Sequence, residues 1–290
     1  MIKNESNPIF PKRVVILGAK GFVASAIQRR LKASGINILP LSHADLDLTD
    51  EDAAIRLSAI LQPADTLLFV AAKAPVKNEE MLVDNIKMGK SICDALKKVK
   101  VSHLLYISSD AVYADSDQLL KESSCAQPGS LHGVMHLARE IMLANVYQGP
   151  LCILRPTLIH GTGDPHNGYG PNRFIRLAKE GKNIDLFGEG EERRDHVWIN
   201  DVAEIVSLAI LSQGTGVLNI ATGEVVSFRN IAEKAVSLAN TGSKILNNQR
   251  IGPMPHKGYR AFDNTGTKNA FPEFQYHSLF SVMEKMANDN

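Results

Sequence analysis

The sequence has 290 residues, which suits one large domain or two closely joined ones with a full apolar core. Its 32 Lys and Arg almost balance its 31 Asp and Glu, so no basic excess indicates a nucleic acid or a membrane surface as partner. Residues 1–10 lack the apolar segment of a signal peptide, and the apolar run at 67–72 is too short to span a bilayer. The three cysteines are widely spaced and form no CxxC pair, which suits a reducing compartment. We therefore expect a cytoplasmic protein.

The first half of the chain alternates short apolar runs with amphipathic stretches. This alternation is typical of βαβ units and predicts a parallel sheet, and the continuous apolar runs indicate strands covered on both faces. The expected strands lie at 13–17, 37–42, 66–71, 103–109 and 151–155, and the expected helices at 22–34, 53–61, 79–99 and 133–144.

The residue composition changes after Pro156. Residues 160–171 are rich in Gly, Pro and Asp and read as a long loop, which is often functional when it follows a sheet strand. Beyond it we expect helices near 173–180, 202–211, 227–240 and 278–287, and strands near 183–187 and 217–220. The predicted fold class is α/β: a Rossmann-type doubly wound parallel sheet in residues 1–170, joined by about 201–222, and a smaller substrate lobe in 171–290. Such a lobe would cover the carboxyl ends of the strands, where open α/β sheets bind ligands.

A glycine-rich turn joins the first expected strand to the first expected helix. Gly18 suits the tight turn, Gly21 lets a pyrophosphate approach the backbone, and the small Ala24 lets the helix pack on the strand. Phe22 and Val23 open that helix, whose free N–H groups and positive dipole end favour phosphates. A glycine pair alone is weak evidence, but its place between strand and helix predicts a dinucleotide site.

The second expected strand ends at Ser42 and His43, where NAD-binding proteins usually carry an acid for the ribose. Lys20 lies in the glycine turn. A missing carboxylate and a nearby cation favour NADP over NAD as cofactor, unless Lys20 is an ordinary solvated lysine. We expect His43 to face the cofactor, and Asp47 and Leu48 to meet its adenine.

Several further segments follow one another in a familiar order. With the glycine turn, they resemble the extended short-chain dehydrogenases/reductases, and as a set they resemble the branch that comprises nucleotide-sugar epimerases, dehydratases and reductases. The segments are Ala71-Ala72-Lys73 after the third strand, Ser108-Ser109-Asp110-Ala111-Val112-Tyr113 after the fourth, Leu154-Arg155-Pro156, the stretch 187–203 with Arg194-Asp195, and Arg260–Asp263.

The resemblance implies roles for matching positions. Residues 71–73 (Ala71, Ala72 and Lys73) would lie alongside the cofactor, and Ser109 would hydrogen-bond a substrate hydroxyl or keto oxygen. Arg194 and Arg260 would contact the diphosphate of a nucleotide sugar, because guanidinium binds phosphate through paired hydrogen bonds. Each arginine could instead form a surface ion pair, and Ser109 could satisfy backbone groups at the strand end. The resemblance also implies a homodimer that pairs the helices at 79–99 and 133–144.

The sequence departs from the family at its catalytic pair, Tyr-x-x-x-Lys. His132 replaces the tyrosine and His136 replaces the lysine, while Gly133, Leu137 and Glu140 keep the family's spacing. In one interpretation His132 is the acid/base, because imidazole titrates near pH 6.5 without a lysine to tune it, and His136 faces the cofactor. In another, proton transfer is lost and the chain is a dinucleotide-binding sensor or partner protein, since a histidine side chain ends roughly 2 Å closer to its backbone than tyrosine.

A third interpretation is metal binding by His132 and His136, which lie one helical turn apart. The glutamate of an HExxH motif is replaced by Gly133, so hydrolytic zinc chemistry would lack its base, and we expect no metal. His160 and His196 stand where the family often has aromatics and could line the same cleft. The leading prediction is an NAD(P)-dependent nucleotide-sugar epimerase or keto-sugar reductase.

Overall fold

Six parallel strands form the centre of the molecule. The computed structural model of the chain describes residue 5, residues 7–165 and residues 167–288. The sheet order is β10-β5-β4-β3-β1-β2. β2 therefore lies on one side of β1 and β3 on the other, and the strand order reverses between them. Ligands of doubly wound sheets bind where the order reverses, at the carboxyl ends of the strands. The strands are β1 Arg13–Leu17, β2 Ile38–Leu41, β3 Asp65–Phe69, β4 His103–Ile107, β5 Leu151–Pro156 and β10 Gly216–Ile220.

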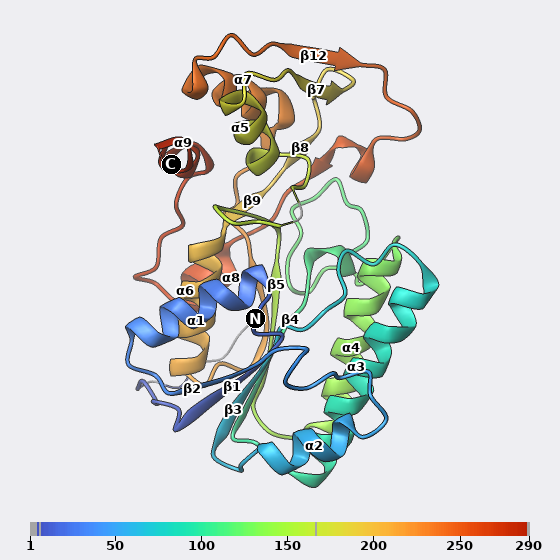
Figure 1. The fold of residues 1–290 in the computed structure, drawn as a ribbon, viewed down its shortest axis with the longest axis vertical. Coiled ribbons are helices and arrows are strands. Elements are labelled where there is room, and N and C mark those ends of the chain that lie inside the picture. Colours follow the sequence, from blue (N-terminus) through green and yellow to red (C-terminus); the bar gives the residue numbers. More distant parts are fainter. Residues whose placement is uncertain (1–4, 6, 166, 289–290) are drawn as a thin grey trace.

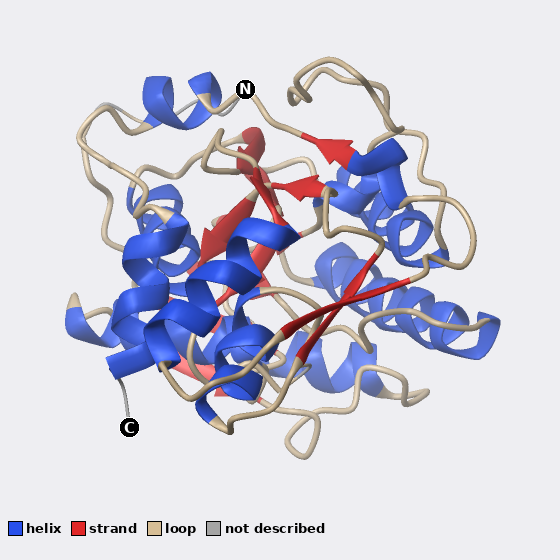
Figure 2. Cartoon of the chain, turned by 90° about the horizontal axis from the view of Figure 1, so that it is seen from above, coloured by secondary structure: helices blue, strands red, loops and turns tan. Residues whose placement is uncertain are grey.

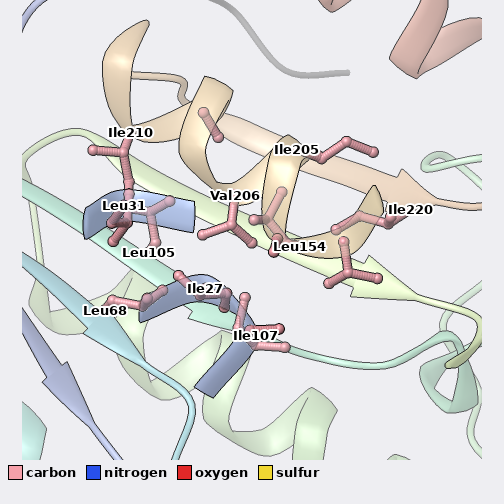
Figure 3. Packing of buried hydrophobic residues seen from close by; sticks show 14 of the residues in the cluster. Ile27, Leu31, Leu68, Leu105, Ile107, Leu154, Ile205, Val206, Ile210 and Ile220 are labelled. Atoms are coloured by element: carbon pink, nitrogen blue, oxygen red, sulfur yellow. The ribbon is translucent and has the colours of Figure 1, made fainter. Parts of the chain in front are cut away.

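Helices α1 (Phe22–Ala33) and α6 (Ile199–Leu211) cover one face of the sheet (Figure 1). Their apolar stripes meet every second residue of the strands, because successive strand side chains point to opposite faces. Figure 3 shows this packing, in which Ile27, Ile205 and Leu154 gather between the helices and the sheet, all three fully buried. The packing fixes the position of the α1 N-terminus at the edge where β1 ends.

Helices α2 (Ala53–Ile60), α3 (Glu79–Lys98) and α4 (Leu131–Val146) cover the opposite face (Figures 1 and 2). The alternate strand residues, such as Leu104 and Tyr106, belong to this second core. Asn78 begins α3 by accepting a hydrogen bond from the Met81 N–H at 3.0 Å. In the part of the chain that the structure describes, no helix has the length and hydropathy needed to cross a membrane.

A smaller lobe, with its own apolar core, lies beyond the carboxyl ends of the strands (Figure 1). The chain leaves the sheet for this lobe through β6 (Leu158–His160) and returns through β9 (His196–Trp198), and these two short strands pair with each other. β11 (Val226–Ser227), β8 (Arg193–Arg194) and β13 (Tyr259–Arg260) form a three-stranded sheet in that order. The remaining elements are α5 Pro171–Lys179, β7 Ile184–Phe187, α7 Phe228–Ala239, β12 Ile245–Asn248, η2 Pro255–Gly258, α8 Thr265–Ala270 and α9 Leu279–Asn288, with η1 Asp110–Val112 in the main domain.

The predicted Rossmann-type α/β fold is confirmed, and every strand and helix expected in the first half exists within a few residues of its predicted bounds. The predicted start of α4 at Gly133 is wrong by two residues, because Ser130 caps the helix by accepting from the Gly133 N–H. The predicted start of α6 at residue 202 is late by three. Residue 166 of the expected 160–171 loop lies outside the described residues.

Candidate functional site

The glycine turn lies where β1 and β3 end. Gly18 has φ +88°, and a Cβ there would lie 2.6 Å from the Cα of Ala71, so both the conformation and the close approach of the two strands require glycine. The Gly21 N–H donates to the Gly18 carbonyl at 3.0 Å. Gly21 is also the N-cap of α1 and provides no side-chain cap, so the first N–H groups of the helix face the turn. This backbone cradle fits a dinucleotide pyrophosphate.

A cavity of about 150 Å³ adjoins the turn. It brings together most of the predicted cofactor residues, although they come from three separate strand ends. A larger cavity of about 660 Å³ lies on the outer side of α1 and α6, contains none of the predicted site residues and is remote from the strand ends. The smaller cavity is lined by Leu17, Gly18, Leu41, His43, Leu46, Asp47, Leu48, Ala71, Ala72, Lys73 and Met88.

Five predicted cofactor residues lie outside that cavity: Gly21 in the backbone turn, His136 on α4, and Lys20, Phe22 and Val23. Lys20 is exposed on the turn itself, and Phe22 and Val23 pack against the core under α1 and α6. Lys73, which lines the cavity, directs its ammonium to Asp84 at 2.6 Å. The cavity therefore carries no unshared positive charge from Lys73.

The acidic side of the cavity is built by Asp47. Its Oδ1 accepts from the Thr49 backbone N–H at 2.9 Å and from the Thr49 hydroxyl, and its Oδ2 lies 2.8 Å from Nε2 of His43. The Thr49 backbone hydrogen bond is the largest cause that lowers the pKa of Asp47. Asp47 is therefore a fixed carboxylate beside the apolar floor made by Leu46 and Leu48.

A carboxylate that the sequence argument missed also lies at the end of β2. Asp45 accepts hydrogen bonds from the backbone N–H of Ser42 at 2.8 Å and from its hydroxyl at 2.6 Å, and these bonds lower the pKa of Asp45. The positive charge of Lys20 acts on the same carboxylate. The premise that no acid stands at this strand end is therefore wrong, because a turn of three residues folds Asp45 back onto it.

The two histidines of the altered catalytic pair lie together on the first turns of α4. Their rings are perpendicular, with centroids 4.7 Å apart, and Nδ1 of His136 lies 2.7 Å from the hydroxyl of Tyr106. Burial lowers the pKa of His132 below 6.5, with Asp110 opposing that shift. Burial, aided by His132 and Arg139, lowers the pKa of His136 further. Both imidazole rings are therefore neutral at pH 7. In the family's Tyr-x-x-x-Lys pair, by contrast, the lysine would be positively charged.

Gly133 sets the position of this pair. A Cβ on Gly133 would lie 2.1 Å from the carbonyl oxygen of Ala111, so α4 can begin against the η1 backbone only with glycine here. Farther along the helix, Glu140 accepts from Ser108 at 2.5 Å and from two nitrogens of Arg155 at 2.9 and 2.5 Å. This buried network holds α4 against the ends of β4 and β5.

Ser109, the predicted substrate contact, is the N-cap of η1. Its hydroxyl accepts from the Ala111 N–H at 3.1 Å and donates weakly to Asp110 at 3.4 Å. The backbone role that the sequence left open is therefore present. Because the contact with Asp110 is long, the O–H of Ser109 can instead turn toward a ligand oxygen.

The two predicted phosphate-binding arginines converge on one carboxylate. Arg260 donates from Nε to Asp110 at 2.9 Å and from another nitrogen to Asp115 at 3.2 Å, and only 2% of its surface is exposed. Arg194 lies 4.0 Å from Asp110 and 3.3 Å from Glu192. Because Arg260 is buried by its acidic partners, Arg194 has the more available guanidinium.

His160 and His196 lie in a pair of short strands next to this arrangement, and Nδ1 of His196 lies 3.2 Å from the carbonyl oxygen of Arg194. They stand on β6 and β9, which pair in parallel, and less than 5% of either residue is exposed. Among the described residues, no cluster of three or more His, Cys, Asp or Glu side chains could hold a metal ion. The metal alternative built on His132 and His136 therefore lacks a third protein ligand there.

The match to protein families covers most of this framework. A model of the NAD dependent epimerase/dehydratase family matches residues 14–221, which include the glycine turn, the whole sheet and both histidines. The chain belongs to this family. The resemblance to extended short-chain dehydrogenases/reductases is thereby confirmed, while the roles of individual residues stay predictions.

Relatives and solved structures agree with that assignment. The chain is 26% identical to dTDP-L-rhamnose 4-epimerase of Burkholderia thailandensis, over 76% of this chain and 79% of the relative. UDP-glucose 4-epimerase of Thermotoga maritima, solved with UDP-glucose, superposes with TM-score 0.84 at 18% identity over 95% of this chain and 97% of that one. UDP-glucuronic acid 4-epimerase of Bacillus cereus, solved with UDP-glucuronic acid and NAD, gives 0.83 at 21% identity over 95% and 98%.

Proposed function

We propose that this member of the epimerase/dehydratase family is an NAD(P)-dependent enzyme that epimerises a nucleotide sugar or reduces a keto sugar of that class. The observation that carries the proposal is the arrangement around Asp110. This carboxylate pairs with both arginines of the substrate side, and its charge also acts on the imidazole of His132, where it opposes the lowering of the pKa by burial. One buried charge thus links the anion-binding end of the cleft to the group that would move the proton.

The chemistry divides between the bound dinucleotide, which supplies hydride acceptance and donation, and the side chains of this chain. His132 would take the proton from a sugar hydroxyl as the carbon gives up its hydride, and would return that proton when the ketone is reduced. Ser109 would donate to the same oxygen. Arg194 would hold a phosphate oxygen. A neutral imidazole is the form that accepts a proton, and His132 is neutral at pH 7.

The alternative is a dinucleotide-binding sensor or partner protein without turnover, since fold alone does not establish activity. The test uses purified protein loaded with oxidised or reduced cofactor, challenged in turn with UDP-, dTDP- and GDP-linked sugars and keto sugars. A change in the nicotinamide absorbance or interconversion of the sugars supports the enzyme. Cofactor binding without either change for every sugar supports the sensor. His132→Phe serves as the control that keeps the fold and removes the proton acceptor.

We further propose a homodimer through α3 and α4. These helices pack on each other, and their outer faces expose Val83, Val134 and Ile141 at 51, 40 and 61%. Such a patch becomes buried when one copy meets another across a two-fold axis. Ile141→Glu should lower the mass measured by light scattering from dimer to monomer, whereas the control Ile55→Glu, equally exposed on α2, should not. A monomeric wild type at micromolar concentration would refute the dimer.

A further inference from the structure

The hydroxyl of Tyr106 lies between two buried side chains of α4. Tyr106 stands on the central strand β4 and is 1% exposed, Arg139 is fully buried and His136 is 6% exposed. The hydroxyl lies 2.7 Å from Nδ1 of His136, and the charge of the nearby Arg139 guanidinium acts on it. Positions 136 and 139 are one turn apart on α4, so both side chains reach the same point of the sheet.

Arg139 is held firmly in this place. It donates from Nε to the Asn85 carbonyl, from NH1 to the Ala71 carbonyl and from NH2 to Oδ1 of Asn85, each at 2.9 Å. Its guanidinium also lies 4.6 Å over the ring of Phe69. A fourth N–H donates to Sδ of Met88 at 3.4 Å, so Arg139 ties α4 to α3 and to the loop after β3.

The direction of each hydrogen bond follows from what the groups can do. A guanidinium has no acceptor, so Arg139 cannot take the phenol proton of Tyr106. Burial raises the pKa of Tyr106, so the phenol keeps its single proton. That proton has one place left to go, which is Nδ1 of His136. A neutral imidazole that accepts at Nδ1 carries its own proton on Nε2.

We propose that Tyr106 is a positioning residue that locks His136 as the Nε2-protonated tautomer, so that His136 offers a fixed N–H donor to an oxygen of the bound cofactor or substrate and takes no part in proton transfer. This inference rests on the proposed function for its catalytic meaning, but the tautomer itself does not. It assigns proton exchange to His132 alone. It also explains how two neighbouring histidines can function together. When His132 takes up a proton, the ring of His136, with its centroid 4.7 Å away, stays neutral and does not repel the new charge.

The tautomer is measurable in the whole protein without turnover. Long-range proton–nitrogen correlation spectra of protein labelled with ¹⁵N-histidine distinguish protonated from bare ring nitrogens, and His136→Gln identifies the His136 signals by their loss. Near pH 7 the wild type should show a bare Nδ1 and a protonated Nε2. Tyr106→Phe should convert this to a mixture of tautomers. The control Tyr147→Phe, which removes a buried hydroxyl that donates to the Val101 carbonyl at 2.9 Å, should leave His136 unchanged.

A protonated Nδ1 in the wild type, or an unchanged tautomer in Tyr106→Phe, overturns the proposal. If Tyr106→Phe does not fold, the wild-type spectrum alone decides. A second readout applies once turnover is found. His136→Gln places an amide N–H near the Nε2 position and cannot exchange a proton, so it should keep at least tenfold more kcat than His136→Ala. Equal loss in both variants would contradict the donor role, while absence of turnover in all proteins would overturn only the proposed function.

Discussion

Acid should destabilise this protein through a histidine outside the cofactor cleft. His160 lies on β6, where the chain enters the lobe, and neither ring nitrogen has a hydrogen-bond partner among the described residues. Burial lowers the pKa of His160 to about 4, and the neighbouring His196 on β9 has its pKa lowered to about 3 by burial first and by His160 second. Folding therefore requires both rings to be neutral.

The sign and size follow from proton linkage. Below pH 6.5 the unfolded chain binds a proton at His160 that the folded chain refuses until about pH 4, so stability is lost as pH falls through this window and is unaffected above it. At about pH 5 the loss from His160 alone is about 2 kcal/mol. His160→Phe removes this term. It should be no less stable than wild type near pH 7, because it also removes an unpaired buried N–H.

The assay is urea unfolding near pH 7 and near pH 5, comparing the pH-dependent change in free energy of unfolding rather than its absolute value. Wild type should lose about 2 kcal/mol more than His160→Phe between the two conditions. His43→Gln is the control, since His43 is 73% exposed and its loss should leave the wild-type dependence intact. If His160→Phe and wild type lose the same stability, the ring of His160 is not buried in its neutral form and the reasoning fails.

Three further predictions concern the residues of the candidate ligand site. Because Asp45 places a carboxylate at the end of β2, we expect NAD to bind more tightly than NADP. Asp45→Asn should raise the affinity for NADP relative to that for NAD. A wild type that binds NADP more tightly would instead support Lys20 as a ligand of the additional phosphate. Arg194→Ala should weaken binding of a nucleoside diphosphate by about 1.5–3 kcal/mol, roughly ten- to hundredfold, with cofactor affinity retained. Arg260→Ala should lower the free energy of unfolding by about 3–5 kcal/mol, measured by urea unfolding, because it leaves Asp110 buried without its partner. The reverse pattern between the two arginines would show that Arg260 is the phosphate ligand.

The parts of the fold that sequence reasoning recovered are those with a local cause. The strands of the main sheet are continuous apolar runs, and the helices between them repeat apolar residues every three or four positions. Gly18 was recognisable because a positive φ and a close strand crossing both demand glycine. The strands that were missed have no such signal. β8 and β13 are two residues long, and β6 and β9 form only because the chain leaves the sheet and returns beside itself.

The sequence named candidate site residues but not their partners. The spacing of the turn pointed to Gly18 and Gly21, while residues 71–73 and the histidine pair were named from the resemblance to a family. Arg260 meets Asp110 across 150 positions, and Tyr106 meets His136 across 30, so only the folded topology brings each pair together. Asp45 was missed for a different reason: its carboxylate reaches the strand end through a local turn that propensity rules do not place to the residue.

His132 decides whether this member of the family is an enzyme. Its ring is largely buried beside a second neutral imidazole, so its pKa lies below 6.5, and only the neutral form can accept a proton from a sugar hydroxyl. If His132 is the base, kcat/KM for oxidation of the sugar should stay constant near pH 7 and should fall only at a pH below 6.5, because the pKa of His132 is lowered, and His132→Phe should abolish turnover while cofactor binding survives. In this oxidation direction, an activity that rises with acid would exclude this role.

Restoring the family's pair sharpens the same test. His132→Tyr alone should be poor, because His136 is a neutral ring that cannot lower the pKa of a phenol. Adding His136→Lys supplies an ammonium, and the double variant should exceed either single change because the two side chains act as a unit. That lysine would lie in the buried site shared with Arg139 and Tyr106, where the nearby guanidinium charge opposes its own. Gain of turnover in the double variant, with none in the wild type, would identify a chain that kept its cleft and lost its proton transfer. Turnover in the wild type that the double variant fails to match would show that the surroundings of His136 are built for a neutral donor, in which case the histidine pair is a working replacement for tyrosine and lysine.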